Sequence, residues 1–441
     1  MVKMLKRKAE ARFQSWYKGP RNKALLVMGA RQVGKSYLAE RFARDHFSHV
    51  VVFDLLRDVS ARESFAGATS ADDLLLRMSV AATESLVPGK TVVIFDEVQE
   101  CPGVVTFIKY LVQQGDYRYI LTGSLLGVKL QNIDSLPVGF ASRLDMYPLD
   151  FEEFCWAMGL DEQVMRRAVA CALHEERLPD YLYNKLSDLF HRYLMVGGMP
   201  DAVNAFVSTN NIDEVRTVHL DLHALYRDDI TKHAPDGLRL VIRDIYDLIP
   251  SQVINASRRF QFGSIENVKR FSQVQDHFLW LTNAGVSLAV YNVAAPVKPL
   301  LMNEQHNKFK LFYLDAGMLA STYPKAVYEG LLDGRPTANM GAVYEAFVAQ
   351  ELAAHGFALR YYASRKVGEL DFLAERADGE LMAIEVKSGA SYLRHASLDH
   401  ALASPGFTID RAIVFAETNV RKDDRVLYLP AFLVGMFTYR D

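Results

Sequence analysis

The octet Gly-Ala-Arg-Gln-Val-Gly-Lys-Ser, residues 29–36, constrains the fold of this chain more than any other feature. It has the spacing GxxxxGKS and lies between an apolar run, 24–28, and a segment of helical character. Glycines at this spacing let the backbone curl so that N–H groups point inward and bind phosphate oxygens. The following helix adds the positive end of its dipole. The octet therefore predicts a phosphate-binding loop.

Single residues of the loop have expected roles toward ATP and Mg²⁺. The Lys35 ammonium can reach the β- and γ-phosphates and act in catalysis, and the Ser36 hydroxyl can hold Mg²⁺. The predicted nucleotide-binding residues of the loop are Gly29, Ala30, Arg31, Gln32, Val33, Gly34, Lys35, Ser36 and Tyr37.

A second motif, Thr-Val-Val-Ile-Phe-Asp-Glu at 91–97, is an apolar run that ends in two carboxylates. Beside the loop, Asp96 would coordinate Mg²⁺ directly or through water, and Glu97 would polarise the attacking water. The next apolar run ends in Leu-Thr-Gly-Ser, where Thr122 or Ser124 could contact the γ-phosphate. Arg143 is a candidate arginine finger for a neighbouring subunit, with an ordinary surface arginine as the alternative.

The first 150 residues alternate apolar runs with helical patterns, which predicts an α/β fold. Near-continuous apolar runs are typical of parallel strands that are buried on both faces, and an order of 5-1-4-3-2 would bring both motifs together. The predicted strands are 24–28, 50–54, 91–96, 118–122 and 144–148.

Three further domains are expected after this core. Residues 151–235 carry helical patterns and predict a helical lid subdomain. Residues 236–335 read as helix, helix capped by Ser264, and β-hairpin, which is the order of a winged helix. Residues 336–441 read as a helix followed by strands, with a hairpin turn at Asp378-Gly379.

Composition limits the partners and the compartment. The formal net charge is −3, so the whole molecule is not an electrostatic binder of nucleic acid. The segment 251–310, however, contains seven Lys/Arg and three Asp/Glu, which fits either DNA contact or a solvated face. No apolar run approaches the ~20 residues that span a bilayer, and three widely spaced cysteines indicate neither disulfides nor zinc. We therefore expect a cytoplasmic protein with no membrane partner.

A second catalytic constellation lies near the C-terminus. Glu369 and Asp371 fall on one predicted strand, and Glu385 and Lys387 fall on the next. The pattern D…ExK is typical of metal-dependent nucleases, in which carboxylates such as Asp371 and Glu385 hold Mg²⁺ or Mn²⁺ and the lysine favours hydroxide formation. Alternating charges on a strand are often only solvated, so a metal-binding or DNA-binding site that does not cleave stays open.

Together these motifs resemble those of the prokaryotic AAA+ family ATPases that carry a C-terminal domain of restriction-endonuclease-like fold. "GARQVGKS", "VVIFDEVQ", "YILTGS" and "YPLDFEEF" carry the resemblance, and "LMVGGMPDAV", "YRDDITKH", "YLDAGML" and "EVKSG" extend it over nearly the whole chain. The resemblance implies an AAA+ core, a winged helix, a nuclease-like domain, and Glu345 as an additional ligand or base. Relatives often have Gly-Arg where this chain has "GFASR", which bears on the role of Arg143 and on whether the chain forms a ring, a dimer or a monomer.

Two functions are consistent with these features. The first is an ATP-hydrolysing AAA+ protein whose nucleotide state controls a DNA-binding, DNA-cleaving module. The second is a nucleotide-gated switch or scaffold that binds DNA or protein through an inactive nuclease-like domain.

Overall fold

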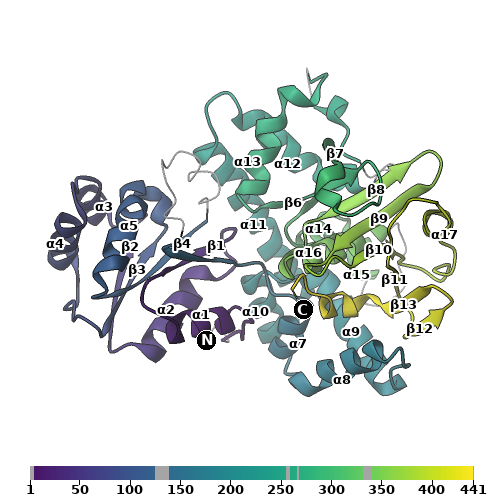
Figure 1. The fold of residues 1–441 in the computed structure, drawn as a ribbon, viewed down its shortest axis with the longest axis horizontal. Coiled ribbons are helices and arrows are strands. Elements are labelled where there is room, and N and C mark those ends of the chain that lie inside the picture. The colour runs from purple at the N-terminus through teal and green to yellow at the C-terminus, as the bar shows by residue number, and fades with distance from the viewer. Residues whose placement is uncertain (1–3, 125–138, 255–258, 266–267, 331–339, 441) are drawn as a thin grey trace. The chain divides into compact units, whose positions relative to one another are not determined.

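The computed structural model describes residues 4–124, 139–254, 259–265, 268–330 and 340–440 (Figure 1). The chain divides into two compact units. The N-terminal unit is Arg7–Tyr147 with the tripeptide Asn283–Gly285, and the C-terminal unit is Met1–Lys6, Pro148–Thr282 and Val286–Asp441. Within the described ranges, no helix has the length and apolar character needed to cross a bilayer.

A five-stranded parallel sheet forms the centre of the N-terminal unit, in the order β2-β3-β4-β1-β5. This confirms the order predicted from the sequence. The strands are β1 Ala24–Met28, β2 His49–Asp54, β3 Thr91–Asp96, β4 Arg118–Gly123 and β5 Ala141–Asp145. The helices are α1 Glu10–Lys18, α2 Lys35–His46, α3 Val59–Ala66, α4 Ala71–Ala81 and α5 Pro102–Gln114, with a 3-10 turn η1 at Val98–Glu100.

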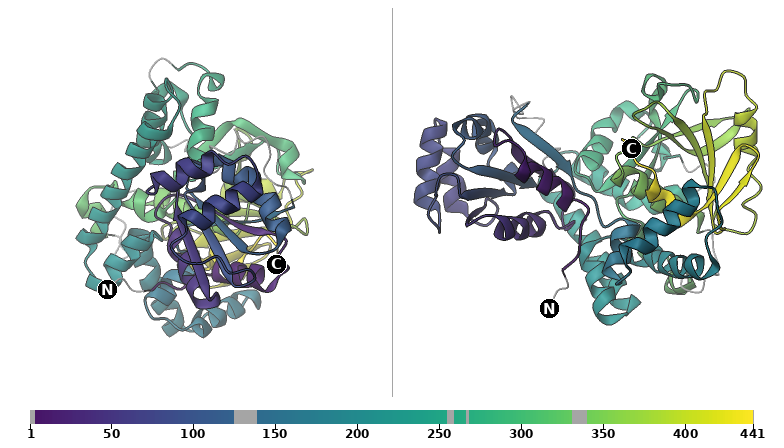
Figure 2. Two further views of the ribbon diagram at one scale, coloured as in Figure 1. Left: turned by 90° about the vertical axis from the view of Figure 1, so that its left-hand side faces the viewer. Right: turned by 60° about the horizontal axis from the view of Figure 1, so that its bottom comes forward.

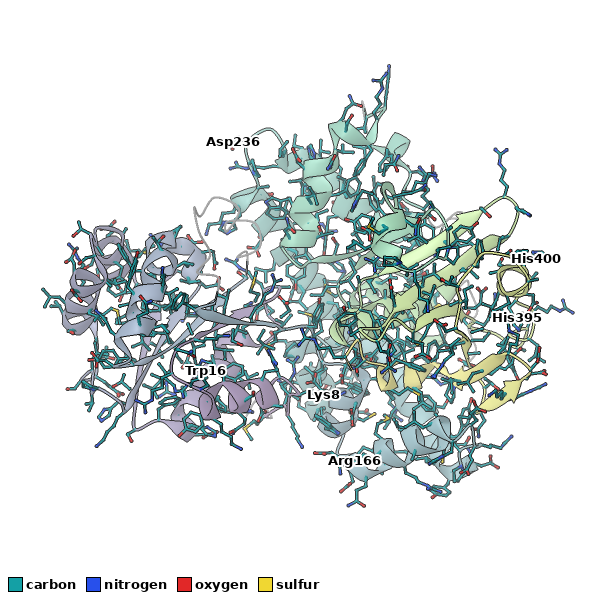
Figure 3. All side chains as sticks on the ribbon, viewed as in Figure 1. Lys8, Trp16, Arg166, Asp236, His395 and His400 are labelled. Atoms are coloured by element: carbon teal, nitrogen blue, oxygen red, sulfur yellow. The ribbon has the colours of Figure 1, made fainter. Side chains whose placement is uncertain are left out.

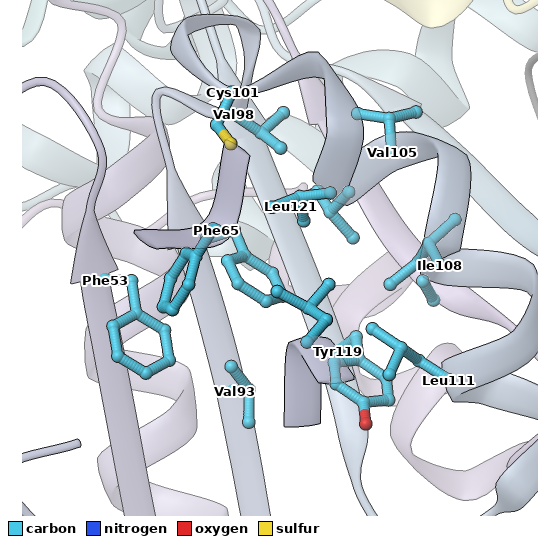
Figure 4. Close-up of a cluster of buried hydrophobic side chains, with 14 of the residues drawn as sticks. Phe53, Phe65, Val93, Val98, Cys101, Val105, Ile108, Leu111, Tyr119 and Leu121 are labelled. Carbon is cyan, nitrogen blue, oxygen red and sulfur yellow. The ribbon is translucent and has the colours of Figure 1, made fainter. Parts of the chain in front are cut away.

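Helices cover both faces of this sheet (Figure 2). Side chains alternate along β2, β3 and β4, so Phe53, Val93 and Leu121 point to one face and pack against α3 and α5 (Figure 4). Ile94 and Ile120 point to the opposite face of the sheet and are fully buried as well. Burial on both faces explains why β3 and β4 are almost continuously apolar.

Helix α1 is joined to the sheet through one buried arginine at the start of β4. The Arg118 guanidinium donates to the carbonyl oxygens of Trp16 (2.9 Å), Tyr17 (2.8 Å) and Gly19 (2.7 Å). It also lies over the indole of Trp16, which Figure 3 labels, at 5.1 Å from the ring centroid. Arg118 therefore satisfies the last carbonyl groups of α1, which have no partner within the helix.

The predicted fifth strand was misplaced by three residues. We expected 144–148, whereas β5 is Ala141–Asp145 and pairs with β1. β5 is one of the two edge strands and only Leu144 of it is buried, so its sequence carries polar residues that hide the strand pattern. Arg143 consequently lies within the strand and not ahead of it.

Helices fill the first part of the C-terminal unit, as the patterns at 151–235 predicted. They are α7 Phe151–Ala157, α8 Glu162–Leu173, α9 Asp180–Val196, α10 Pro200–Thr209 and α11 Ile212–His233. Further helices are α12 Arg239–Ile254, α13 Gln275–Asn283, α14 Ala316–Ser321, α15 Lys325–Gly330, α16 Gly341–Ala354 and α17 Ala396–Leu402. The 3-10 turns are η3 Phe262–Ser264, η4 Phe271–Gln273, η5 Leu300–Asn303 and η6 Ala431–Met436.

An eight-stranded mixed sheet forms the rest of this unit, in the order β12-β13-β11-β10-β9-β8-β6-β7. Its strands are β6 Ser287–Val293, β7 Glu304–Tyr313, β8 Arg360–Ser364, β9 Gly368–Glu375, β10 Leu381–Val386, β11 Arg411–Ala416, β12 Arg421–Asp423 and β13 Val426–Pro430. The predicted hairpin turn joins β9 to β10, and Gly379 within it has a φ of 88°.

The hairpin β6–β7 was expected to be the wing of a separate domain that ends at 335. Instead β6 also pairs in parallel with β8, so one sheet runs across the predicted boundary. The predicted start of the helix before this hairpin was wrong. Ser264 ends the 3-10 turn η3 and does not cap a helix, and α13 begins at Gln275. The intervening turn η4 is held by the Gln273 side chain, which accepts from the backbone N–H groups of Lys269 and Arg270.

Candidate functional site

The phosphate-binding loop connects β1 to α2 through backbone conformations that favour glycine. Gly29 has a φ of 151°, and a Cβ there would overlap the carbonyl oxygen of Met146. Gly34 has a φ of 90° and immediately precedes α2, and Gln32 between them has a φ of 66°. The loop is therefore curled, with Lys35 and Ser36 in the first turn of α2. Ala30 and Val33 are buried, whereas Tyr37 is exposed.

Lys35 is buried at the start of α2. Its Nζ donates to the carbonyl oxygen of Ala30 at 2.7 Å, so the ammonium lies against the loop itself. Burial lowers the pKa of Lys35 to about 8, while the carboxylates of Glu97 and Asp96 act in the opposite direction. A bound polyphosphate would supply the negative charge that this buried cation favours.

Asp96 joins three elements of the site. Its carboxylate accepts from the Ser36 hydroxyl at 2.6 Å and from the Thr122 hydroxyl at the end of β4. Burial raises the pKa of Asp96, and the two hydroxyl groups oppose that shift. A hydroxyl and a carboxylate in contact are the oxygen donors that Mg²⁺ prefers, so the residues present fit this ion.

Glu97 follows β3 in a left-handed conformation, with φ 52° and ψ 47°. Such a conformation costs a non-glycine residue about 1–3 kcal/mol and is held only where neighbours impose it. The carboxylate accepts from the side chain of Gln99 and from the Ser124 hydroxyl at 2.9 Å. Burial alone would raise the pKa of Glu97, but Gln99, Lys35 and Ser124 hold it below its usual value. Glu97 is therefore kept as a carboxylate.

Ser124 and Arg31 complete this group, and Arg143 does not join it. The Arg31 Nε lies 3.4 Å from the Ser124 hydroxyl oxygen. Arg143 projects from the edge strand, pairs with Asp145 at 2.8 Å, and its side chain is 63% exposed. The structure thus brings Lys35, Ser36, Asp96, Glu97 and Ser124 together and leaves Arg143 at the surface of the same unit.

The second constellation surrounds a lysine that sequence reasoning missed. Lys310 on β7 is fully buried, and its Nζ lies 2.6 Å from Glu369, 3.5 Å from Glu345 and 3.9 Å from Asp371. Its ammonium also lies over the rings of Tyr361 and Phe372. A lone lysine in the apolar strand "FKLFY" was the available signal, because lysine is seldom fully buried without a partner.

Glu385 and Lys387 lie at the end of β10 in the same cluster. The Lys387 Nζ donates to Oε1 of Glu385 at 2.7 Å, and Asp371 accepts from the backbone N–H of Val386 at 2.8 Å. Within the described part of the chain, Oε2 of Glu385 is buried and has no hydrogen-bond partner. Burial and the Asp371 carboxylate raise the pKa of Glu385. A buried carboxylate oxygen with no donor beside a second carboxylate fits a divalent cation.

The basic segment 251–310 is less basic than its composition indicates. Lys310 is enclosed by carboxylates, and Lys298 pairs with Asp410 at 2.7 Å. Arg258 lies outside the described residues. The charge count, which fitted either DNA contact or a solvated face, therefore includes two lysines whose charge is paired with carboxylates. His219 and His223 are buried and hydrogen bonded to backbone carbonyl groups, so they pack within the fold.

In the comparison with known proteins, three family models match three separate parts of the chain. Residues 21–155 match the AAA domain, 187–326 match a domain of unknown function (DUF8612), and 340–432 match another domain of unknown function (DUF4143). No curated protein matches the chain. The N-terminal match covers the loop, the carboxylate pair and Ser124, so this chain carries an AAA-type P-loop ATPase domain.

Solved structures give only remote likenesses. The chain is similar to a Walker-type ATPase of Pyrococcus abyssi, with 14% identity, 72% of this chain and 95% of that chain covered, and a TM-score of 0.43. It is similar to Orc1 of Aeropyrum pernix in complex with DNA, with 13% identity, 76% and 94% covered, and a TM-score of 0.29. It is also similar to the Thermotoga maritima RuvB branch migration motor, with 14% identity, 68% and 89% covered, and a TM-score of 0.27. At these TM-scores we base no argument on the likenesses.

Proposed function

We propose that this protein binds and hydrolyses Mg-ATP at the N-terminal site and that its nucleotide state controls a DNA-binding module in the C-terminal unit. We further propose that this module cleaves phosphodiester bonds at Asp371, Glu385 and Lys387, with Glu345 as an additional ligand or base. The nuclease-like fold, the winged-helix role of 236–335 and the DNA partner belong to this proposal.

The observation that carries the ATPase assignment is the hydrogen bond between Ser36 of the loop and Asp96 of the neighbouring motif. Gly34 and the first turn of α2 would bind the phosphates, and Ser36 with Asp96 would hold Mg²⁺. The ion, when bound, neutralises charge that develops on the phosphate oxygens. Glu97, held as a carboxylate, orients a water for attack and accepts its proton, while Ser124 fixes that carboxylate.

Two variants test the N-terminal site. Lys35→Ala is expected to abolish ATP binding, because it removes the only buried ammonium that faces the loop in the described residues. Glu97→Gln is expected to bind ATP with nearly unchanged affinity and to lower kcat by about 100-fold or more, because the amide cannot accept the water's proton. Phosphate release and nucleotide binding are the measurements. Unchanged hydrolysis in both variants would overturn the assignment.

Support for cleavage comes from the buried, unpartnered oxygen of Glu385 beside Lys387. Asp371 and Glu385 would hold one divalent cation, which polarises the phosphate and lowers the pKa of its bound water. The attacking water would lose one proton to solvent and form a bond from its oxygen to phosphorus, the ester P–O bond would break, and the leaving oxygen would take up a proton from solvent. Lys387, beside these carboxylates, favours the hydroxide and the developing negative charge.

The test of cleavage uses plasmid and single-stranded DNA with Mg²⁺ or Mn²⁺. The unmodified chain should nick or degrade at least one substrate, and Lys387→Ala should lower the rate by about 100-fold or more. Lys308→Ala serves as the control, because Lys308 also lies on β7 but is not part of the acidic cluster. DNA binding without cleavage in both metals would favour the nucleotide-gated switch.

Control by nucleotide state has one supporting feature within the N-terminal unit. The tripeptide Asn283–Gly285, which begins with the last residue of α13 and precedes β6, belongs to that unit. A Cβ on Gly285 would lie 3.3 Å from the backbone nitrogen of Ala30 in the phosphate-binding loop, and Gly285 has a φ of 74°. Gly285 and the phosphate-binding loop therefore belong to the same unit, and the chain continues from Gly285 towards β6.

A further inference from the structure

A glutamine two residues after the proposed base has no part in the mechanism above. Gln99 lies in the turn η1 and is only 2% exposed. Val98, which precedes it, is buried in the apolar core of the N-terminal unit (Figure 4), and the N–H of Glu100 donates to the carbonyl oxygen of Glu97 at 2.9 Å. This turn is therefore fixed by the core and by its own backbone, and it brings the Gln99 carboxamide onto the Glu97 carboxylate.

The orientation of this carboxamide follows from the chemistry of its partner. An ionised carboxylate accepts hydrogen bonds and donates none, so only the amide nitrogen of Gln99 can face it. Nε2 of Gln99 accordingly donates to Oε2 of Glu97. Oε1 of Gln99 is then left buried, and the part of the chain that the structure describes offers it no hydrogen-bond donor. A buried acceptor without a donor lowers stability, so the N–H group of Gln99, and not the stability of the fold, accounts for a glutamine here.

The donors around Glu97 distinguish its two carboxylate oxygens. Oε2 accepts from Nε2 of Gln99, from the Ser124 hydroxyl at 2.9 Å and from the Ser124 backbone N–H at 3.4 Å. All the hydrogen bonds that the described residues give to this carboxylate are on Oε2. An oxygen that already accepts from three donors is a poor acceptor for a further proton, since it carries two lone pairs. Oε1 is therefore the oxygen that can accept the proton of an attacking water.

We propose that Gln99 is a positioning residue for ATP hydrolysis, which together with Ser124 holds Oε2 of Glu97 so that Oε1 faces the attacking water. This inference rests on the proposed function of Glu97 as the base. The two donors come from different elements, the turn η1 and the residue after β4, so together they fix the rotation of the Glu97 side chain.

Gln99 exchanges no proton in this step. The water oxygen bonds to the γ-phosphorus as one proton passes to Oε1 of Glu97, the bond from phosphorus to the bridging oxygen breaks, and its electron pair leaves with ADP. Glu97 then returns the proton to solvent. Loss of Gln99 should therefore lower turnover and leave the binding of ATP intact.

The test compares Gln99→Met, which keeps a side chain of similar length and removes its N–H donors, with Gln114→Met. Gln114 at the end of α5 donates to Asp72 at 2.6 Å on the surface, so the control loses the same kind of bond outside the site. Gln99→Met should lower kcat by about 10- to 100-fold. It should leave the Kd for a non-hydrolysable ATP analogue within about twofold of that of the unmodified chain, and its Tm without nucleotide should not fall. Gln114→Met should leave kcat unchanged.

A double-mutant cycle separates positioning from an independent effect. In a Glu97→Gln background, which has lost the base, adding Gln99→Met should lower kcat by less than about twofold, because a positioning residue acts only through the group that it positions. A further loss of about 10-fold or more in that background would show that Gln99 acts without Glu97 and would overturn the proposal.

The remaining outcomes distinguish this inference from the proposed function. Unchanged kcat in Gln99→Met, with kcat lowered in Glu97→Gln, would overturn the role of Gln99 and leave the base intact. Unchanged kcat in Glu97→Gln would overturn the base itself and the positioning role with it. A lower Tm or a failure to fold in Gln99→Met would show that the glutamine serves stability, which also overturns the proposal.

Discussion

Single buried charges in this chain either face a candidate site or hold the fold together, and Asp315 is an example of the second kind. Its carboxylate accepts from the backbone N–H of Gly198 at 2.6 Å and of Met318 at 3.1 Å, and from the Gln350 side chain at 3.3 Å. These contacts explain the motifs "LMVGGMP" and "YLDAGML", which the proposed chemistry does not use. Asp315 connects α9, α14 and α16.

Asp315 should make the stability of the protein depend on pH. Burial raises its pKa from 3.8 to about 6, against the opposing effect of its hydrogen bonds. The folded chain therefore binds this proton more tightly than the unfolded chain does. The associated stability is fully present below pH ~4 and is lost as the pH rises through about 6, a change on the order of 3 kcal/mol.

The measurement is the free energy of unfolding of the unmodified chain and of Asp315→Asn between pH 4 and pH 7. The amide does not titrate, so the difference between the two proteins should decrease as the pH rises from 4 through about 6 and level off only towards pH 7. Other titrating groups are common to both proteins and cancel. A difference that does not vary with pH would show that Asp315 is ionised throughout.

The residues of the N-terminal site were predictable because their chemistry depends on local spacing. Lys35 and Ser36 belong to one loop, and Asp96 and Glu97 are neighbours at one strand end. Lys310 was not predictable in this way, since its partners lie about 35–60 residues away and meet it only through the order of the sheet. Glu345 was reached through resemblance, and its burial against Lys310 came from the structure.

Among the elements, the turn between α9 and α10 is set by close approach of two backbones. The carbonyl oxygen of Gly198 accepts from the N–H of Leu149 at 2.7 Å. A Cβ on Gly198 would overlap the Leu149 carbonyl oxygen. Because both neighbours are backbone atoms just before α7, neither can move without displacing a helix.

Gly198→Ala is therefore expected to lower the free energy of unfolding by at least about 3 kcal/mol. Gly263→Ala is the control in the same unit, because a Cβ at Gly263 has nothing within 4 Å and its φ is not positive. Denaturant unfolding monitors both variants. Similar stability of the two would mean that the turn relaxes without cost.

On the scale of the whole molecule, the sequence predicted one sheet closely and the other only in part. The parallel sheet follows from apolar runs and from the motifs at their ends, and its order was correct. The eight-stranded sheet depends on the pairing of β6 with β8, which lie about 70 residues apart. A hairpin pattern contains no information on what pairs with its outer edge, so the predicted domain boundary fell within this sheet.

The proposed control of DNA binding by nucleotide requires a coupling that can be measured in both directions. In a Glu97→Gln background, ATP should change the Kd for fluorescent DNA by a factor of roughly 5–150, and saturating DNA should change the Kd for ATP by the same factor, because linkage is reciprocal.

Gly285→Ala should reduce this factor, since its Cβ would press on the Ala30 backbone nitrogen. Gly115→Ala is a matched control, because Gly115 has a φ of 75° but open space around its Cβ position. A factor of one in both directions would exclude control by nucleotide, and equal effects of the two glycine variants would exclude Asn283–Gly285 as its route.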